Sequence, residues 1–237
     1  MLKDGLYEQI INKSLDAELA TTDKLSTTAP IDSAEASKVL AKYIAEVVEQ
    51  GLDNLVDNGG DVSSQVALAN RIISTIINET KENGFDEMSV AERAEQLLAL
   101  FDKKNSILAL DEKAQIIRPE TSIAQSSLFT GAIHEPQMYT ELKKEIVSCN
   151  RIDMLVSFIK WSGLRLIMDE LRDFTQNGGQ LRIITTSYMG ATDIKAIEEL
   201  SKLPNTEIKV SYDTKRTRLH AKTYVFYRDT GFTTAYV

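Results

Sequence analysis

Hydrophobic residues recur every three or four positions through much of the first 118 residues, which is the spacing of amphipathic helices. The clearest runs span 39–52 and 66–77 and stop before Asn58-Gly59-Gly60 and Asn83-Gly84. A third run follows Ser89, which has Glu92 three residues later in a capping-box pattern, and it extends to Phe101. A Thr- and Ser-rich loop is expected over residues 21–30. The helical periodicity predicts an all-α N-terminal domain over residues 1–118. No motif in this domain carries chemistry, so we expect it to have a packing or partner-binding role.

The pattern changes near Pro119. Residues 116–137 contain Pro119, Gly131 and Pro136 and show little periodicity. Beyond them, helical periods alternate with short apolar runs. Helices are expected over 139–148, 163–175 and 191–202, and strands over 152–159, 181–185, 207–212, 219–227 and 232–237. Nearly continuous apolar strands are typical of a sheet that is buried on both faces. We therefore predict an α/β domain over residues 119–237, with a mixed, mainly parallel sheet and helices on both faces.

Polar residues follow two of the predicted strands. Lys160, Trp161 and Ser162 come after the first strand, and the stretch 185–188 ends the second. The carboxyl ends of parallel strands share one edge of a sheet, where α/β proteins bind ligands. Lys160, Ser162 and Thr186 are therefore candidate phosphate ligands, although such residues also serve in ordinary turns and caps. Asp193 is expected to cap the helix that follows Thr192.

A basic run near the end of the chain contains the most specific chemistry. Lys215, Arg216 and Arg218 lead to His220 and Lys222, and residues two apart on a strand point to the same face. An imidazole beside fixed cations suits phosphodiester cleavage by a histidine nucleophile, because the cations neutralise charge that develops on the phosphate oxygens. The same spacing also fits a solvated basic edge strand with an incidental histidine.

Three longer stretches give this run a context. Residues 152–163, 183–193 and 211–222, the last ending in Leu219-His220-Ala221-Lys222, resemble the phospholipase D-like domain at the N-terminus of a group of bacterial DEAD/DEAH-box helicases. Residues 119–121, 125–131 and 5–11 are similar to the same proteins. The resemblance implies a metal-independent phosphodiesterase with His220 as nucleophile. It also implies that Lys222 holds a non-bridging oxygen, while Arg216 and Arg218, with Lys215, contact the phosphate backbone.

The chain departs from the family pattern after Lys222. The family has an Asp about five residues beyond this Lys and then Gly-Ser-x-Asn, whereas here position 227 is Tyr and the nearest carboxylate is Asp229. The sequence ends before the Gly-Ser-x-Asn part, so we expect a C-terminally truncated domain that is inactive alone. With one His-x-Lys motif, the second imidazole that protonates the leaving oxygen would come from a second copy in a homodimer.

The resemblance therefore predicts that the chain is a nuclease module of a DNA helicase–nuclease. Its substrate would be DNA, or alternatively RNA, and its partners would be the C-terminal helicase domains. No cofactor is expected for this domain, because ATP and Mg²⁺ would belong to the absent helicase part. Two alternatives stay open. The module could be catalytically decayed and serve in DNA binding or dimerisation, or it could be a structural assembly platform.

Composition bears on nucleic-acid binding, on metal binding and on membrane contact. The net charge is −8, but residues 1–130 carry −10 and residues 131–237 carry +2, so the predicted nuclease half can still bind a phosphate backbone. The only cysteine, Cys149, excludes an internal disulfide, and with His134 and His220 it is too little for a Cys/His metal site. We expect Cys149 to be a packing residue and His134 to lie in a surface loop. No apolar run approaches the ~20 residues of a membrane span, and the N-terminus lacks a signal-peptide layout, so we expect a cytoplasmic protein without membrane contact.

Overall fold

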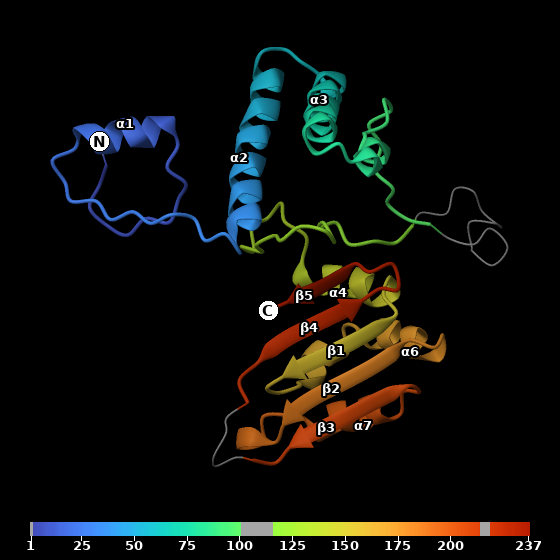
Figure 1. The fold of residues 1–237 in the computed structure, drawn as a ribbon. Coiled ribbons are helices and arrows are strands. Elements are labelled where there is room, and N and C mark those ends of the chain that lie inside the picture. Colours follow the sequence, from blue (N-terminus) through green and yellow to red (C-terminus); the bar gives the residue numbers. More distant parts are fainter. Residues whose placement is uncertain (1, 101–115, 214–218) are drawn as a thin grey trace. The chain divides into compact units, whose positions relative to one another are not determined.

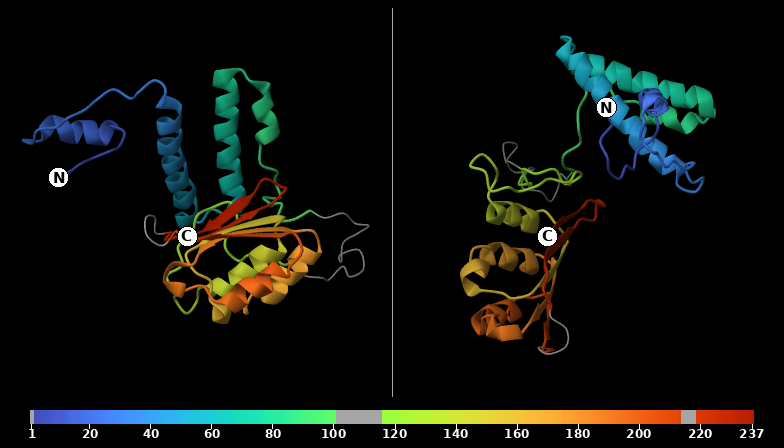
Figure 2. Two further views of the ribbon diagram at one scale, coloured as in Figure 1. Left: turned by 90° about the horizontal axis from the view of Figure 1, so that it is seen from below. Right: turned by 90° about the vertical axis from the view of Figure 1, so that its left-hand side faces the viewer.

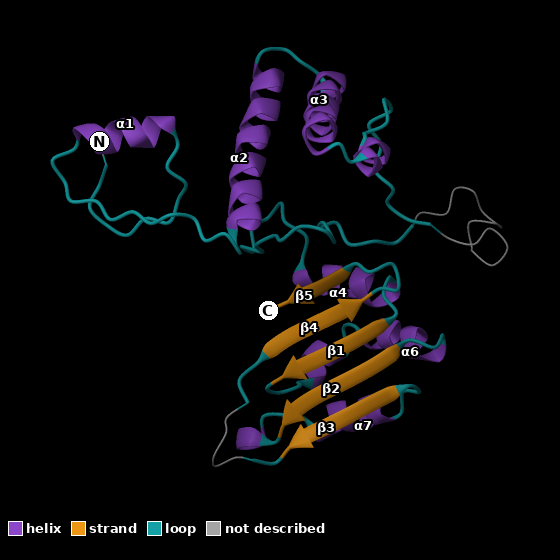
Figure 3. Ribbon diagram, viewed as in Figure 1, coloured by secondary structure: helices purple, strands orange, loops and turns teal. Residues whose placement is uncertain are grey.

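The computed structural model of the chain describes residues 2–100, 116–213 and 219–237. The chain divides into two compact units, Met1–Leu100 and Phe101–Val237 (Figure 1). The first unit contains helices, and the second contains helices together with a sheet (Figure 3). The domain boundary that we expect between residues 118 and 119 stays a prediction, because residues 101–115 lie outside the described part of the chain.

The first unit begins with three α-helices. These are α1 (Lys13–Thr21), α2 (Ala36–Asp57) and α3 (Val62–Thr80), followed by the 3-10 helix η1 (Asn83–Met88). The predicted helices over 39–52 and 66–77 are confirmed by α2 and α3. The turn between them needs a glycine at Gly59, whose φ of 83° lies in the left-handed region. Asp61 then caps α3 by accepting the Ser64 N–H at 2.9 Å.

The helix predicted from Ser89 is wrong, because residues 89–100 contain no helix. The backbone of Val90 is instead held by Asn70 of α3. The Val90 N–H donates to Asn70 Oδ1 at 2.8 Å, and the Val90 carbonyl accepts from Asn70 Nδ2 at 2.9 Å. Ala94 has a φ of 50°, which would interrupt a helix in any case. Two bonds to a distant side chain thus outweigh the local capping signal. Phe101, at the end of the predicted run, lies outside the described residues.

The helices of the first unit keep apolar faces in contact with solvent. No described residue of α1, α2 or α3 is buried. On α2, Leu40, Ile44 and Val47 are spaced as one helical face and are 45%, 51% and 47% exposed. Burial of such a face normally supplies most of the stability of a helix in a protein. The exposed stripe therefore keeps the predicted partner-binding role of this unit open.

The second unit is built on a five-stranded sheet. Its elements are α4 (Met138–Val147), β1 (Arg151–Val156), α5 (Trp161–Leu164), α6 (Met168–Gln176), β2 (Gln180–Thr186), η3 (Tyr188–Gly190), α7 (Ile194–Ser201), β3 (Thr206–Ser211), β4 (Lys222–Tyr227) and β5 (Thr233–Tyr236). The strand order is β3-β2-β1-β4-β5. Strands β1, β2 and β3 are parallel, whereas β4 is antiparallel to β1 and β5 is antiparallel to β4. The predicted α/β class with a mixed sheet is confirmed, and the phospholipase D-like assignment stays a prediction.

The prediction of helices on both faces of this sheet is wrong. Helices α4, α6 and α7 all lie on one face (Figure 2). On the opposite face, Leu155 of β1 and Ile184 of β2 are 37% and 44% exposed. The chain steps in one direction from β1 to β2 to β3, and successive right-handed crossovers in one direction place their helices on the same side. Strands β1 and β2 each contain consecutive apolar residues, but only every second residue of the strand faces the helices.

The core lies between the sheet and this helical layer. Its fully buried members are Ile146, Ile152, Leu171, Leu181, Ile183, Ala196, Leu200 and Phe226. Predicted element boundaries shift where this core requires it. The helix expected over 163–175 is divided into α5 and α6, because Ile167 turns into the core and its N–H bonds to the Leu164 carbonyl three residues back. The helix expected over 191–202 begins only at Ile194.

A buried carboxylate attaches the segment before α4 to this unit. Residues 116–137 contain no helix or strand, as predicted. Glu141 of α4 accepts the N–H groups of Glu120 at 2.9 Å and Thr121 at 3.1 Å, and it also pairs with Lys144 at 3.0 Å. Burial would raise the pKa of Glu141, but the bonds from Thr121 and Lys144 outweigh it and hold the pKa below the ordinary 4.5.

A second buried carboxylate fastens the β4–β5 hairpin. Glu145, one turn along α4, is ion-paired with Arg228, and the two side chains are 1% and 7% exposed. Thr234 donates to Glu145 at 2.8 Å and Tyr236 donates at 3.0 Å. Cys149 follows α4 and packs against the core, where burial raises the pKa of its thiol to about 12. The thiolate is therefore disfavoured, in agreement with the predicted packing role.

Candidate functional site

The strand ends that were expected to form a site do meet at one edge of the sheet. Val156, Thr186 and Ser211 are the last residues of β1, β2 and β3, and β4 begins at Lys222, opposite Val156 (Figure 1). We call this end of the sheet the carboxyl edge. Ligands of α/β proteins bind at the corresponding edge. The described segments that leave it are residues 157–160, 187–193, 212–213 and 219–221, and residues 214–218 lie outside the described part.

His220 lies at the carboxyl edge but not within a strand. We expected a strand over 219–227, whereas β4 begins at Lys222. The reason is that β1 ends at Val156, so the ladder stops at the Val156–Lys222 pair. Beyond it, the N–H and the hydroxyl of Ser157 both donate to the Ala221 carbonyl, at 2.8 and 3.0 Å. These two bonds fix the backbone between His220 and Lys222, both of which are exposed.

Three other residues of the predicted site cannot be placed. Lys215, Arg216 and Arg218 lie outside the described residues, so the basic strand leading to His220 stays a prediction. His134, the other histidine of the chain, is exposed in a turn before α4, as predicted. No hydrogen bond joins the His220 imidazole to another described residue.

The end of β2 is organised by hydroxyl groups that are used internally. Thr186 is 2% exposed, its hydroxyl donates to the Ser211 carbonyl at 3.0 Å, and it accepts the Tyr188 N–H at 3.1 Å. The Thr192 hydroxyl donates to the Thr186 carbonyl at 2.8 Å. These bonds stabilise the turn and join the ends of β2 and β3. The structure therefore favours a turn-stabilising role for Thr186 over the predicted contact with phosphate.

The loop after β1 is joined to the loop after β2 by Asp193. This residue occupies the N-cap position of α7, as predicted, but its side chain makes no capping bond. Its carboxylate instead accepts the Trp161 N–H at 2.9 Å and pairs with Lys160 at 3.1 Å. The Trp161 N–H and then the Lys160 ammonium lower the pKa of Asp193 below its usual range. Ser162, the third residue of this predicted group, is exposed in α5.

The residues that join the loops were not foreseen as site residues. Ser157 and Ala221 are separated by 64 positions in the sequence, and Asp193 and Trp161 by 32. No local pattern marks such pairs, because the first contact arises only when β1 and β4 become neighbours and the second only when β1 and β2 do. Lys160, Asp193, Asp213 and Lys222 are charged described residues that follow or begin strands at this edge, and the ammonium of Lys195 in α7 lies 4.5 Å from the centre of the Trp161 ring.

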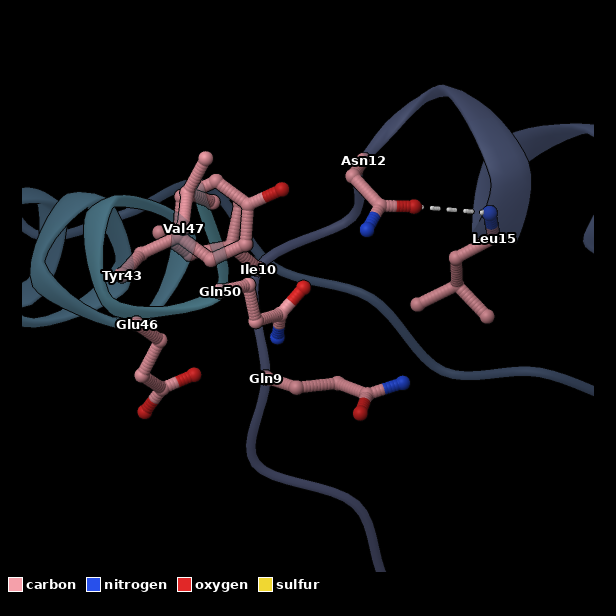
Figure 4. Close-up of a pocket in the computed structure, with 8 residues that line it drawn as sticks. All are labelled: Gln9, Ile10, Asn12, Leu15, Tyr43, Glu46, Val47 and Gln50. Atoms are coloured by element: carbon pink, nitrogen blue, oxygen red, sulfur yellow. Dashed lines mark hydrogen bonds between the residues drawn. The ribbon is translucent and has the colours of Figure 1, made fainter. Parts of the chain in front are cut away.

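Two hollows lie elsewhere in the molecule. One, of about 270 Å³, is in the first unit, where Gln9, Ile10, Asn12 and Leu15 approach α2 near Tyr43 and Gln50 (Figure 4). The other, of about 540 Å³, is at the opposite end of the sheet from the carboxyl edge and includes Asn150, Gln180 and Tyr227. Neither hollow includes His220 or Lys222. Within the described residues, no group of three or more His, Cys, Asp or Glu side chains is arranged to hold a metal ion.

No protein-family model matches the chain, and no curated protein matches it at a significant level. In the described residues, no helix is both long enough and apolar enough to span a membrane.

Proposed function

We propose that the chain is the phospholipase D-like nuclease module of a cytoplasmic helicase–nuclease, and that this module cleaves phosphodiester bonds of DNA without a metal when it is part of the full-length protein. The observation that supports this most directly is the pair of bonds from Ser157 to the Ala221 carbonyl. They hold the His220-Ala221-Lys222 backbone at the carboxyl edge, where α/β sheets bind ligands. The resemblance of residues 211–222 to a family of such nucleases supports the same assignment.

The reaction would proceed in two steps. In the first, a neutral His220 nitrogen attacks phosphorus, the bond from phosphorus to the leaving oxygen breaks, and a phosphohistidine forms while a second imidazole protonates the leaving oxygen. In the second, water attacks the phosphohistidine, gives its proton to that second imidazole, and releases the phosphate end of the DNA and His220. Lys222 would neutralise the non-bridging oxygens, and Lys215, Arg216 and Arg218 would contact the backbone.

The second imidazole would come from a second copy of the chain. The sequence has two histidines, and His134 belongs to a different segment, before α4. A two-fold axis that brings together two copies of His220 supplies both the nucleophile and the acid, so the mechanism needs a homodimer.

One observation favours the alternative of a decayed DNA-binding or dimerisation module. Catalytic imidazoles are commonly oriented by a bond to their second ring nitrogen. No described residue provides such a bond for His220. A surface of this kind can contact a phosphate backbone without cutting it.

Cleavage of supercoiled DNA in the presence of a chelator tests the proposal. We expect nicking by the full-length helicase–nuclease, none by its His220→Ala variant, and much slower nicking by its Lys222→Ala variant. His134→Ala is the matched control and should cut normally. DNA binding is measured in parallel. Cutting that depends on added Mg²⁺, or that survives in His220→Ala, contradicts the nuclease assignment, whereas binding without cutting supports the decayed module. Equal cutting of a matched RNA would extend the substrate class.

A further inference from the structure

Asp193 makes three contacts with the loop that follows β1. Its backbone N–H donates to the Ile159 carbonyl at 2.9 Å, one carboxylate oxygen accepts the Trp161 N–H at 2.9 Å, and the other pairs with the Lys160 ammonium at 3.1 Å. The three bonded residues are consecutive. Both the backbone and the charged group of this short loop are therefore held by a single residue from another loop.

These contacts are not required by α7 itself. A residue that directly precedes a helix usually accepts an N–H from the first turn, and an Asp at this position is well suited to do so. The Asp193 backbone carbonyl accepts the Ala196 N–H at 3.0 Å, but the Asp193 carboxylate makes no such bond. The side chain instead binds the loop that follows β1 at the carboxyl edge, which carries the predicted phosphate ligand Lys160.

We propose that Asp193 is a positioning residue that fixes the turn at Ile159–Trp161 and orients Lys160 towards a phosphate group of nucleic acid bound at the carboxyl edge. The inference rests on the proposed function. An ammonium has three N–H donors, so one bond to Asp193 leaves two for phosphate oxygens. Because Lys160 and Asp193 are 49% and 37% exposed, their attraction is weakened by solvent, and the geometry of the loop matters more than the energy of the pair.

Substitution at Asp193 separates positioning from charge, because the two predict opposite signs. Asp193→Ala removes a negative charge from a nucleic-acid site, which by electrostatics alone strengthens binding to DNA. If Asp193 is a positioning residue, the same substitution weakens binding, because Lys160 is no longer oriented. Asp193→Asn removes the charge but keeps one oxygen, which can still accept the Trp161 N–H, while its amide nitrogen cannot accept from the Lys160 ammonium. It should therefore keep the turn and lose less DNA affinity than Asp193→Ala.

Trp161 is the only tryptophan of the chain, so its fluorescence reports on this loop directly. In the full chain, we expect Asp193→Ala to shift the emission maximum to the red and to increase quenching by acrylamide, while Asp193→Asn stays close to the native spectrum. Glu198→Ala, which removes an exposed carboxylate from α7, is the matched control and should change neither property. Circular dichroism confirms that each variant is folded.

DNA affinity across a range of salt concentrations completes the test. Asp193→Ala should weaken binding and lower the slope of log K against log salt by about 0.9, the value of one phosphate contact, as Lys160→Ala should. If Asp193→Ala and Asp193→Asn both bind more tightly and to the same degree, Asp193 acts only as a charge and the inference is overturned. An unchanged Trp161 spectrum in Asp193→Ala overturns it as well. A native protein that binds no DNA is a different result, because it removes the proposed function itself.

Discussion

Arg228→Met should destabilise the second unit strongly, because it leaves a buried carboxylate without its cation. Glu145 is 1% exposed, and its two oxygens are bound by Arg228, Thr234 and Tyr236. Methionine has about the length of the arginine stem and no charge, so it fills much of the same space. The substitution therefore tests electrostatics more than packing.

The size of the loss in stability depends on the groups that still contact Glu145 after Arg228 is replaced. Removing one partner of a buried ion pair costs about 3–5 kcal/mol, since the other charge is left in a poorly solvated place. The hydroxyls of Thr234 and Tyr236 still donate to Glu145, which favours the lower end, about 3 kcal/mol. Replacing both members together, as Glu145→Leu with Arg228→Met, removes the unpaired charge and should cost less than Arg228→Met alone.

Urea unfolding followed by Trp161 fluorescence measures this for the second unit alone, because Trp161 belongs to that unit. With a urea m-value of about 2 kcal/mol/M, the midpoint should fall by about 1.5 M. Arg172→Met is the control. Its ion pair with Asp169 is exposed, so the free energy of unfolding should change by less than about 1 kcal/mol. A loss below about 1 kcal/mol for Arg228→Met, or a double variant as unstable as the sum of both single variants, would refute the reasoning.

Three further predictions concern the same unit. The pKa of Glu141 is lowered in the folded state, so its stabilising contribution is present above its ordinary pKa of 4.5 and is lost as the pH falls through the folded value. Proteolysis within residues 116–137 should therefore accelerate below about pH 4. Cleavage at an unchanged rate would contradict this prediction. Gly179→Ala would place a Cβ 2.3 Å from the Phe174 ring, so it should cost about 1–3 kcal/mol in the urea titration, and a neutral result would mean that the ring moves freely. Leu155→Lys and Ile184→Lys should each change the free energy of unfolding by less than about 0.5 kcal/mol, because these side chains lie on the uncovered face of the sheet; a loss of several kcal/mol in the same titration would show that something covers them.

The sequence predicted the order and type of most elements because local periodicity reports which face of an element is buried. Strands β1 to β5 and helices α2, α3 and α4 follow from it within a few residues. What the periodicity does not encode is the path of the chain between elements. The single helical layer is a consequence of successive strands stepping in one direction, and an apolar run such as Ile183-Ile184 does not reveal that only Ile183 faces the helices.

The same limit applies to the site. The carboxyl edge could be predicted, because parallel strands bring their ends together whatever their sequence. The roles of individual residues there depended on distant partners. The Asp193 carboxylate binds Trp161, 32 positions away in the sequence, instead of an N–H of α7. The ladder between β1 and β4 ends where Ser157 bonds to Ala221, 64 positions away in the sequence. Local capping and strand signals are accurate only where no such partner competes with them.

The most direct test of the proposed nuclease is whether DNA becomes covalently attached to His220. The full-length helicase–nuclease is mixed with a labelled oligonucleotide in the presence of a chelator, quenched with alkali, digested and examined by mass spectrometry. We predict a nucleotide adduct on the peptide that contains His220, and no adduct in His220→Ala. Cleavage that proceeds without this adduct, or an adduct on another residue, would contradict the assignment of His220 as the nucleophile.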